Sequence, residues 1–437
     1  MASEHILAPE NRIMAAQPSL LTPVGSQERI ASIDVLRGVA LLGILTINIW
    51  GFALPDIVFN DPSAVGGWQG WNKGVWIFFH LFCEQKMMSL FSMLFGAGLI
   101  VMASRADARG TSLLGIYYRR IAWLLVFGLL HAYLLWDGDI LVPYALCGLV
   151  LYPFRRLRPG VQILLGTLVF LSQVLLMIAL GLLEVGLREA TGPNNDRGTE
   201  EQQEWRRSLE EEILPNRDID TAVERHHQGY VAQFGRRAED NLSEEFAGFV
   251  FWSGPRAGGL MLIGMGLMQL GVFAAVRSFR FYAALTLCGY ALGLPLVGYG
   301  ILDQIRSHFD PVHQLLLGGH FNYIGSLFVA LGHAGLVMLI CKAGLLSWLT
   351  ARLAAVGRMA LSNYLMQSLL CTTLFEGWGF GLFGKLDRFP LLGVVVSIWI
   401  LQLVISPIWL RYFRFGPMEW LWRSLTYWKL YPLRASS

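Results

Sequence analysis

Apolar runs long enough to cross a membrane recur along this chain, and they constrain its fold more than any other feature. Runs of about 17 to 25 residues follow one another between positions 35 and 410, separated by short charged joints. Because a bilayer core offers backbone groups no water partner, such runs cross it as helices. A barrel would instead show period-two alternation. The sequence therefore predicts an all-α fold, a polytopic transmembrane helical bundle.

Composition supports this class and excludes others. Of 437 residues, 54% are hydrophobic and 15% are charged, whereas soluble domains carry roughly 25% charged residues. The net charge is +3 without a basic tail or patch, so nucleic acid is not an expected partner. The five cysteines are widely spaced and form no CxxC pair, which favours small apolar fillers over disulfides and predicts no metal site.

The apolar runs predict about ten spans and a defined orientation. Arginine-rich joints fall on one side of the membrane if the spans alternate, and the positive-inside rule makes that side cytoplasmic, with both chain termini. The expected location is the bacterial cytoplasmic (inner) membrane. The predicted spans are 35–54, 75–104, 120–136, 140–154, 161–187, 246–276, 281–302, 315–341, 359–375 and 391–410.

Five regions follow from these spans. They are a cytoplasmic segment (1–30), a first bundle of about five spans (31–187), a charged extracytoplasmic loop (188–245), a second bundle of about five spans (246–414) and a cytoplasmic tail (415–437). The loop is either a solvated cap or an acidic substrate-binding lid. Run 75–104 would measure about 45 Å as one helix, longer than a hydrocarbon core, which predicts a tilt, a kink or an interfacial stretch.

Polar residues gather at the cytoplasmic end of the first span. Asp34 and Arg37 are three residues apart on one helical face and can pair, and Asn48 lies on nearly the same face but deeper. One interpretation is helix capping with positive-inside anchoring. The other is that Arg37 holds an anionic cofactor group while Asn48 lines a path inward.

The second apolar run carries His80, Glu84 and Lys86. His80 and Glu84 have the i, i+4 spacing that permits a hydrogen bond, which alone is weak evidence for a metal site. Glu84 and Lys86 can equally be interfacial charges whose long side chains reach toward the membrane surface.

His131 lies in the outer half of its span and is followed by the motif WDGDIL. A buried imidazole that donates to a backbone carbonyl is one interpretation. The other is a general base oriented by a neighbouring carboxylate. We expect Asp137 to orient the imidazole and Asp139 to cap the following helix.

Asn363 and Gln367 share one face of an apolar helix at i, i+4 spacing. Hydrogen bonding between helices is the favoured interpretation, and contact with a substrate is the alternative. The chain has no P-loop, GxGxxG loop, GxSxG elbow or HExxH motif, which argues against ATP-driven transport and the common hydrolase designs.

Five blocks in order resemble the bacterial YeiB family of uncharacterised inner-membrane proteins: IDVLRGVALLGILTINI, KMMSLFSMLFGAGL, LLHAYLLWDGDIL, GRMALSNYLMQSLLCTTLF and RYFRFGPMEWLWRSLTYWK. The first block is also distantly similar to transmembrane acyltransferases of the heparan-alpha-glucosaminide N-acetyltransferase type, through Asp34, Arg37, Gly38 and Asn48. That resemblance implies transfer of an acyl group from cytoplasmic acyl-CoA to an acceptor, with histidine as the catalytic group. The loop after the first span, residues 55–71, has no histidine, so the expectation moves to His131.

The resulting hypothesis is a transmembrane acyltransferase with acyl-CoA, expected to be acetyl-CoA, as the donor. The acceptor would be a hydroxyl or amine on a small molecule or glycan at the outer side. Catalysis is assigned to His131 and Asp137; donor binding to Arg37, Arg119, Arg120, Asn48 and Lys86; and acceptor binding to Asp139, Asn363 and Gln367.

Two other function classes fit the same residues. In a transporter or permease for a small metabolite, the buried polar groups would line a conduit. A non-catalytic membrane scaffold would tolerate their substitution. Gly-rich spans such as GGLMLIGMGLMQLG can pack against neighbouring helices or a second subunit, so a homodimer is one further expectation.

Overall fold

The computed structural model describes residues 30–191, 203–204, 219–249 and 253–434. These residues form helices, with no strand beyond an isolated bridge between Phe413 and Arg434. The all-α prediction is therefore confirmed. Segment 1–29 and most of the charged loop before residue 219 lie outside the described residues. The helices are α1 (Ala31–Ala53), α2 (Ile57–Asn60), α3 (Gly70–Phe82), α4 (Lys86–Ala108), α5 (Leu114–Leu134), α6 (Leu141–Leu151), η2 (Tyr152–Arg156), α7 (Pro159–Thr191), α9 (Ile219–His226), α10 (Tyr230–Gly248), α11 (Gly254–Gln269), α12 (Phe279–Arg306), α13 (Pro311–His313), η4 (Gln314–Gly318), α14 (Gly319–Ala343), α15 (Ser347–Arg358), α16 (Ala360–Phe375), α17 (Arg388–Tyr412) and α18 (Pro417–Tyr427).

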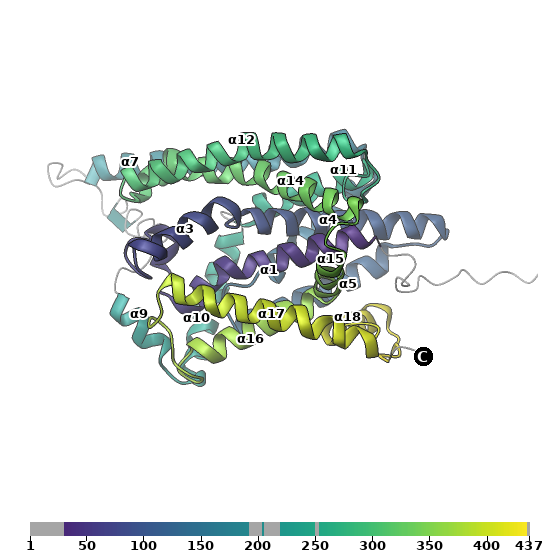
Figure 1. Ribbon diagram of the computed structural model, residues 1–437. Coiled ribbons are helices and arrows are strands. Elements are labelled where there is room, and N and C mark those ends of the chain that lie inside the picture. Colours follow the sequence, from purple (N-terminus) through teal and green to yellow (C-terminus); the bar gives the residue numbers. More distant parts are fainter. Residues whose placement is uncertain (1–29, 192–202, 205–218, 250–252, 435–437) are drawn as a thin grey trace, which may run out of the picture.

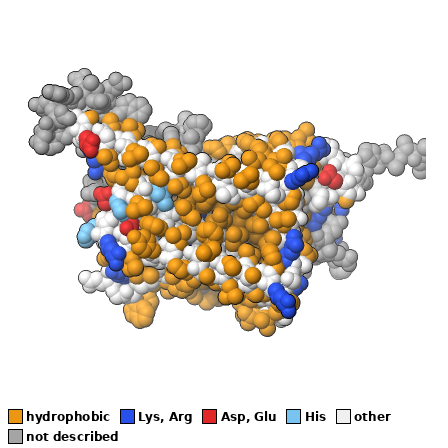
Figure 2. Space-filling model, turned by 90° about the horizontal axis from the view of Figure 1, so that it is seen from above, with side chains coloured by type: hydrophobic (Ala, Val, Ile, Leu, Met, Phe, Trp, Pro, Cys, Tyr) orange, Lys and Arg blue, Asp and Glu red, His pale blue; other side chains and the backbone are white. Residues whose placement is uncertain are grey.

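Six helical stretches among the described residues are long and apolar enough to cross a membrane. Helices α5, α6, α11 and α16 do not meet both criteria, so the count of about ten spans stays a prediction. Figure 2 shows a broad apolar band between two ends that carry charged side chains. The six stretches are Ala31–Ala53, Gly70–Ala108, Pro159–Ala190, Phe279–Arg306, Pro311–Ala343 and Arg388–Tyr412.

Helix α1 is the central element of the bundle. It packs against α4, α14, α15, α16 and α17, and its Leu36 and Leu45 are fully buried. Helix α7, by contrast, lies at the periphery and exposes Leu164 and Leu175 at 59% and 70%. Because exposed leucines along a whole helix are unfavourable in water, this outer face matches a hydrocarbon surround.

Glycines bring α4 and α11 into backbone contact. A Cβ atom at Gly96 would lie 1.9 Å from the Met261 carbonyl oxygen, and one at Gly264 would lie 2.0 Å from the Met93 carbonyl oxygen. Only a residue without a Cβ fits at such a crossing. The Gly-rich span is thus used within the chain, and the homodimer stays a prediction.

The second apolar run is broken into α3 and α4 at residues 83–85. Gln85 has φ 62°, a left-handed conformation that ends one helix and lets the next start in a new direction. Of the tilt, the kink and the interfacial stretch that the length of this run allows, the structure shows the kink. In Figure 1, α9 lies at one end of the bundle, whereas α18 and the C-terminus lie at the other.

Candidate functional site: two cavities and a buried histidine network

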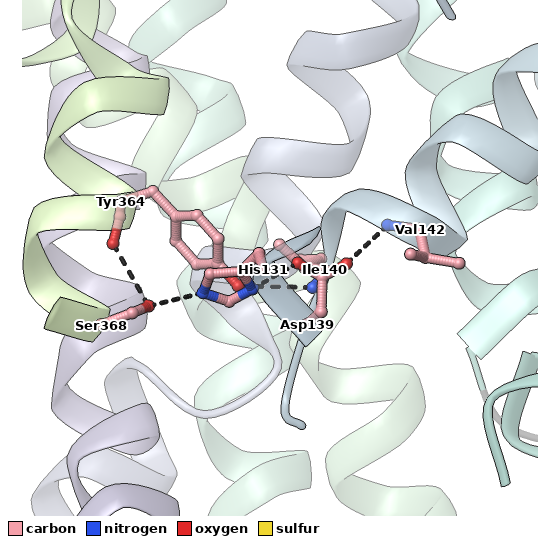
Figure 3. A network of polar contacts seen from close by, with 6 residues as sticks. All are labelled: His131, Asp139, Ile140, Val142, Tyr364 and Ser368. Carbon is pink, nitrogen blue, oxygen red and sulfur yellow. Dashed lines mark hydrogen bonds and ion pairs between the residues drawn. The ribbon is translucent and has the colours of Figure 1, made fainter. Parts of the chain in front are cut away.

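His131 is the centre of a buried network that joins three helices. Its Nδ1 lies 2.7 Å from Asp139 Oδ1, which can only accept, and its Nε2 lies 2.8 Å from Ser368 Oγ (Figure 3). The second Asp139 oxygen accepts from the Val142 amide at 2.6 Å and caps α6. A single carboxylate therefore orients the imidazole and caps the helix.

The assignment of Asp137 as the orienting carboxylate was wrong, because Asp139 makes that contact. Trp136 is buried beneath Gly138, so the turn between α5 and α6 directs residue 139 inward and leaves Asp137 exposed. Asp139 accordingly lies in the His131 network rather than at an acceptor site.

The His131 side chain has no exposed surface, and both ring nitrogens already have partners. The Tyr364 ring covers it, with ring centroids 5.0 Å apart. His131 lines neither of the two cavities described below. Sequence analysis missed Ser368. Its position four residues after Tyr364 puts both side chains on one face of α16, which was a usable signal that they contact the same neighbour.

The first of the two cavities is called the arginine cavity here. It has a volume of about 290 Å³ and lies at the end of the bundle that carries α18. Apolar side chains such as Ile44 and Phe91 line its inner part, and Tyr364 also lines it. Five guanidinium groups surround its mouth, on Arg37, Arg105, Arg120, Arg358 and Arg423. Guanidinium groups of this kind match phosphate oxygens.

Contacts among these groups fix their positions. Arg37 donates to Asp34 at 3.2 Å, which confirms the predicted pairing. The Arg120 guanidinium lies 3.5 Å from the centre of the Trp422 ring. Arg119 does not line the cavity, since its Nε donates to the Gly115 carbonyl at the surface. Asn48 is half-buried on α1 and lines neither cavity.

Helix α18 closes one side of the arginine cavity through Glu419. Its carboxylate accepts from the Ser362 amide at 3.0 Å and from the Ser362 hydroxyl at 2.6 Å, which caps the start of α16. Burial raises the pKa of Glu419 above its ordinary value. Arg423, one turn further along α18, is thereby held at the cavity mouth.

The second cavity is called the histidine cavity here. Its volume is also about 290 Å³, and it lies toward the opposite end of α1. His80 Nδ1 is 2.5 Å from Glu84 Oε2, which confirms the contact that the spacing predicts. Trp76 covers the imidazole, with centroids 4.8 Å apart. His80 Nε2 has no hydrogen-bond partner among the described residues. The cavity thus contains an imidazole with a carboxylate beside its Nδ1 and no hydrogen-bond partner at its Nε2.

Two buried cations lie close to this histidine cavity. Lys86 is fully buried and donates to Asn322 Oδ1 and, at 2.5 Å, to the His80 carbonyl. Arg256 donates to Ser89 and Ser326 at 2.9 and 2.8 Å. Lys86 therefore lies beside the histidine cavity. The prediction that it binds acyl-CoA together with the arginines placed it at the wrong end of the bundle.

Sequence analysis did not single out Arg256 or Asn322. An arginine inside apolar run 246–276 was a signal for Arg256, because intramembrane charges need a partner or a function. Asn322 gave no comparable local signal.

The two cavities are separated by a thin partition. Along α1, Ile44 lines the arginine cavity and Trp50 lines the histidine cavity. Around the start of α4, Phe91 lines the arginine cavity and Gln85 lines the histidine cavity. Each pair is six residues apart, about 9 Å at the rise of an α-helix. Met87 packs against Gly43 within this layer, where a Cβ on the glycine would be 2.4 Å from Met87 Cγ.

Asn363 and Gln367 do not bind at either cavity. Asn363 donates to Ser406 Oγ at 3.0 Å, and Gln367 donates to Gln402 Oε1 at 2.9 Å. Gln402 in turn donates to the Asn363 carbonyl. These bonds confirm the interhelical interpretation and overturn the acceptor-binding assignment, because the amide groups face α17.

Comparisons with known proteins place the chain in a family. It is 32% identical to "Uncharacterized protein YeiB" of Escherichia coli over 91% of this chain and 96% of that protein. The chain belongs to the YeiB family. It is also 31% identical to "Uncharacterized protein YxaH" of Bacillus subtilis over 95% of this chain and 98% of the relative. A family model described as "Protein of unknown function (DUF418)" matches residues 267–429. No solved structure gives a significant match.

Proposed function

We propose that this protein is a transmembrane acyltransferase of the bacterial cytoplasmic membrane. It would move an acyl group, with acetyl as the expected one, from cytoplasmic acyl-CoA to a hydroxyl or amine at the outer side. The observation that carries the proposal is the pair of cavities toward opposite ends of α1, one lined by arginines and the other by a carboxylate-oriented histidine.

The arginine cavity suits the donor. The phosphates of acyl-CoA need several fixed cations, which the five guanidinium groups supply, and the apolar interior suits the pantetheine arm and thioester. The positive-inside rule puts this mouth at the cytoplasm, where acyl-CoA is made.

The histidine cavity suits the acceptor. Once the thioester has passed the partition at Met87 and Gly43, His80 Nε2 would take the proton of the acceptor hydroxyl or amine while that group attacks the thioester carbonyl. The carbon–sulfur bond then breaks, the proton passes from His80 to the sulfur, and CoA leaves as its thiol. Glu84 holds the imidazole in the required orientation. Lys86 donates to the His80 carbonyl and to Asn322, and so holds the segment that carries His80 in place.

This assignment replaces His131 with His80 as the proposed base. His131 has neither an unengaged nitrogen nor a cavity wall, whereas His80 has both. A general base contributes about 10² to 10⁴ in rate. His80→Ala should therefore lower acyl transfer by at least about 10²-fold while leaving CoA affinity unchanged.

The experiment uses purified protein in nanodiscs, with acetyl-CoA as the donor and glycerol as a probe acceptor. CoA thiol release and radiolabelled product are measured for wild type, His80→Ala and His308→Ala. His308 is an exposed histidine outside both cavities and serves as the matched control. Equal turnover in all three proteins would reject the assignment of His80, and no turnover in wild type with water or glycerol would count against acyl transfer.

A transporter is the second candidate, because cavities toward opposite faces also characterise alternating access. It predicts that a solute accumulates in proteoliposomes chemically unchanged. Acyl transfer predicts instead that CoA thiol forms in proportion to acylated product.

A further inference from the structure

Unpaired polar atoms gather around the histidine cavity. Among the described residues, the buried atoms without a hydrogen-bond partner include His80 Nε2, Gln85 Oε1, Arg256 Nε and Nη1, Gln314 Nε2 and His320 Nε2. All five residues line this cavity. A buried polar atom without a partner is unfavourable, so a cluster of them around a cavity suits a molecule that supplies the partners.

The chemistry of these atoms restricts the ligand. Arg256 and Gln314 offer donors, whereas the free oxygen of Gln85 only accepts. The two imidazole nitrogens can take either role. A carboxylate or phosphate can accept from these donors but cannot donate to the Gln85 oxygen. An ammonium group can donate to that oxygen but cannot accept from the donors. Hydroxyl groups both donate and accept, so several hydroxyls on one molecule satisfy the whole set.

Aromatic rings and volume restrict it further. Trp50, Trp76 and Tyr323 also line the cavity and add apolar wall to it. A volume of about 290 Å³ is at the lower end for small-molecule pockets. Apolar walls beside fixed polar groups in so small a volume suit a compact ring that carries both C–H groups and several hydroxyls.

His80 and Arg256 make this a built site. They are 3% and 7% exposed, and their unpaired nitrogens belong to side chains that are otherwise held in place, by Glu84 and by Ser89 and Ser326. The site is therefore preorganised, and a ligand would not have to order these side chains.

We infer that the histidine cavity binds a compact, uncharged, polyhydroxylated ring, a monosaccharide or cyclic polyol, and that one of its hydroxyls is the acyl acceptor. The second clause rests on the proposed function; the first does not. Gln314 and Arg256 hold the ring by donating to its oxygens, and Gln85 accepts from one of its hydroxyls.

Binding is tested without acyl-CoA, by the thermal unfolding midpoint of the protein in nanodiscs. The probes are myo-inositol and glucose, with cyclohexanol as the ring without multiple hydroxyls and cyclohexanecarboxylate as the anion. Gln314→Leu removes one free donor of the cavity. Gln162→Leu is the control, since Gln162 is a buried glutamine with an unpaired oxygen that lies outside the cavity.

We expect myo-inositol or glucose to raise the midpoint, and the apparent affinity to fall about 3- to 10-fold in Gln314→Leu, the effect of one hydrogen bond, but not in Gln162→Leu. A larger shift with cyclohexanol or cyclohexanecarboxylate, equal shifts in both variants, or no shift with any probe would overturn the inference. Labelled acetyl-CoA is then added. Polyol binding without label transfer would reject the acceptor role and the proposed function, and leave the binding site standing.

Discussion

Replacement of Asp139 by alanine should destabilise the protein far more than replacement of Asp137. Asp139 accepts from His131 Nδ1 at 2.7 Å and from the Val142 amide at 2.6 Å, and its side chain is 1% exposed. Each bond to a charged group contributes about 1.5–3 kcal/mol, and its loss leaves a buried imidazole nitrogen without a partner. The expected loss is about 3–5 kcal/mol, the usual cost of breaking a buried charged contact.

Asp137 is exposed, and the bond to His131 is made by Asp139 instead, so Asp137→Ala should change the free energy of unfolding by less than about 0.5 kcal/mol. The free energy is measured by reversible unfolding in mixed micelles, with the two variants side by side. A larger loss for Asp137→Ala, or equal losses, would refute the assignment of Asp139 as the residue that joins α5 to α6.

Three further outcomes are expected. Burial raises the pKa of Glu376, in the loop after α16, to about 7, so between about pH 4.5 and 7 the unfolded chain ionises while the folded carboxyl keeps its proton. Wild type should therefore lose stability as pH rises through this window and Glu376→Gln should not, which a pH series of unfolding measurements checks. Gly96→Ala should lower the free energy of unfolding by about 1–3 kcal/mol, because the new Cβ meets a backbone carbonyl of α11. Gly115→Ala should be neutral or stabilising by up to about 1 kcal/mol, because a Cβ there has nothing within 4 Å. Thermal unfolding of the two variants in parallel tests this pair. Arg423→Ala should weaken CoA binding about 10-fold, more at low salt, and Arg119→Ala should not, since only Arg423 lines the cavity; equal titration curves for the two variants would contradict this.

Local patterns in the sequence were sufficient where the interaction is local. The apolar runs predicted the helical fold, and the spacings of Asp34 with Arg37 and of His80 with Glu84 predicted contacts that the structure contains. In each case both residues lie within a few positions of one another, so helix geometry alone brings them together.

Contacts between distant segments could not be read from spacing. Ser368 reaches His131 across 237 positions, and Lys86 reaches Asn322 across 236. Which carboxylate faces His131 depends on how Trp136 packs in the turn, and this is a tertiary effect. The same limit explains why Lys86 was grouped with the arginines, since its position follows from the break at residues 83–85.

Sided acyl transfer in proteoliposomes tests the central claim most directly. Acetyl-CoA is present only on the side of the arginine cavity, and a probe polyol, myo-inositol, only on the opposite side. The two-cavity account predicts labelled acetyl-inositol on the polyol side, CoA thiol on the donor side, and loss of both products in His80→Ala. Product that forms only when donor and polyol share one side, or polyol that crosses unmodified without CoA release, would contradict it.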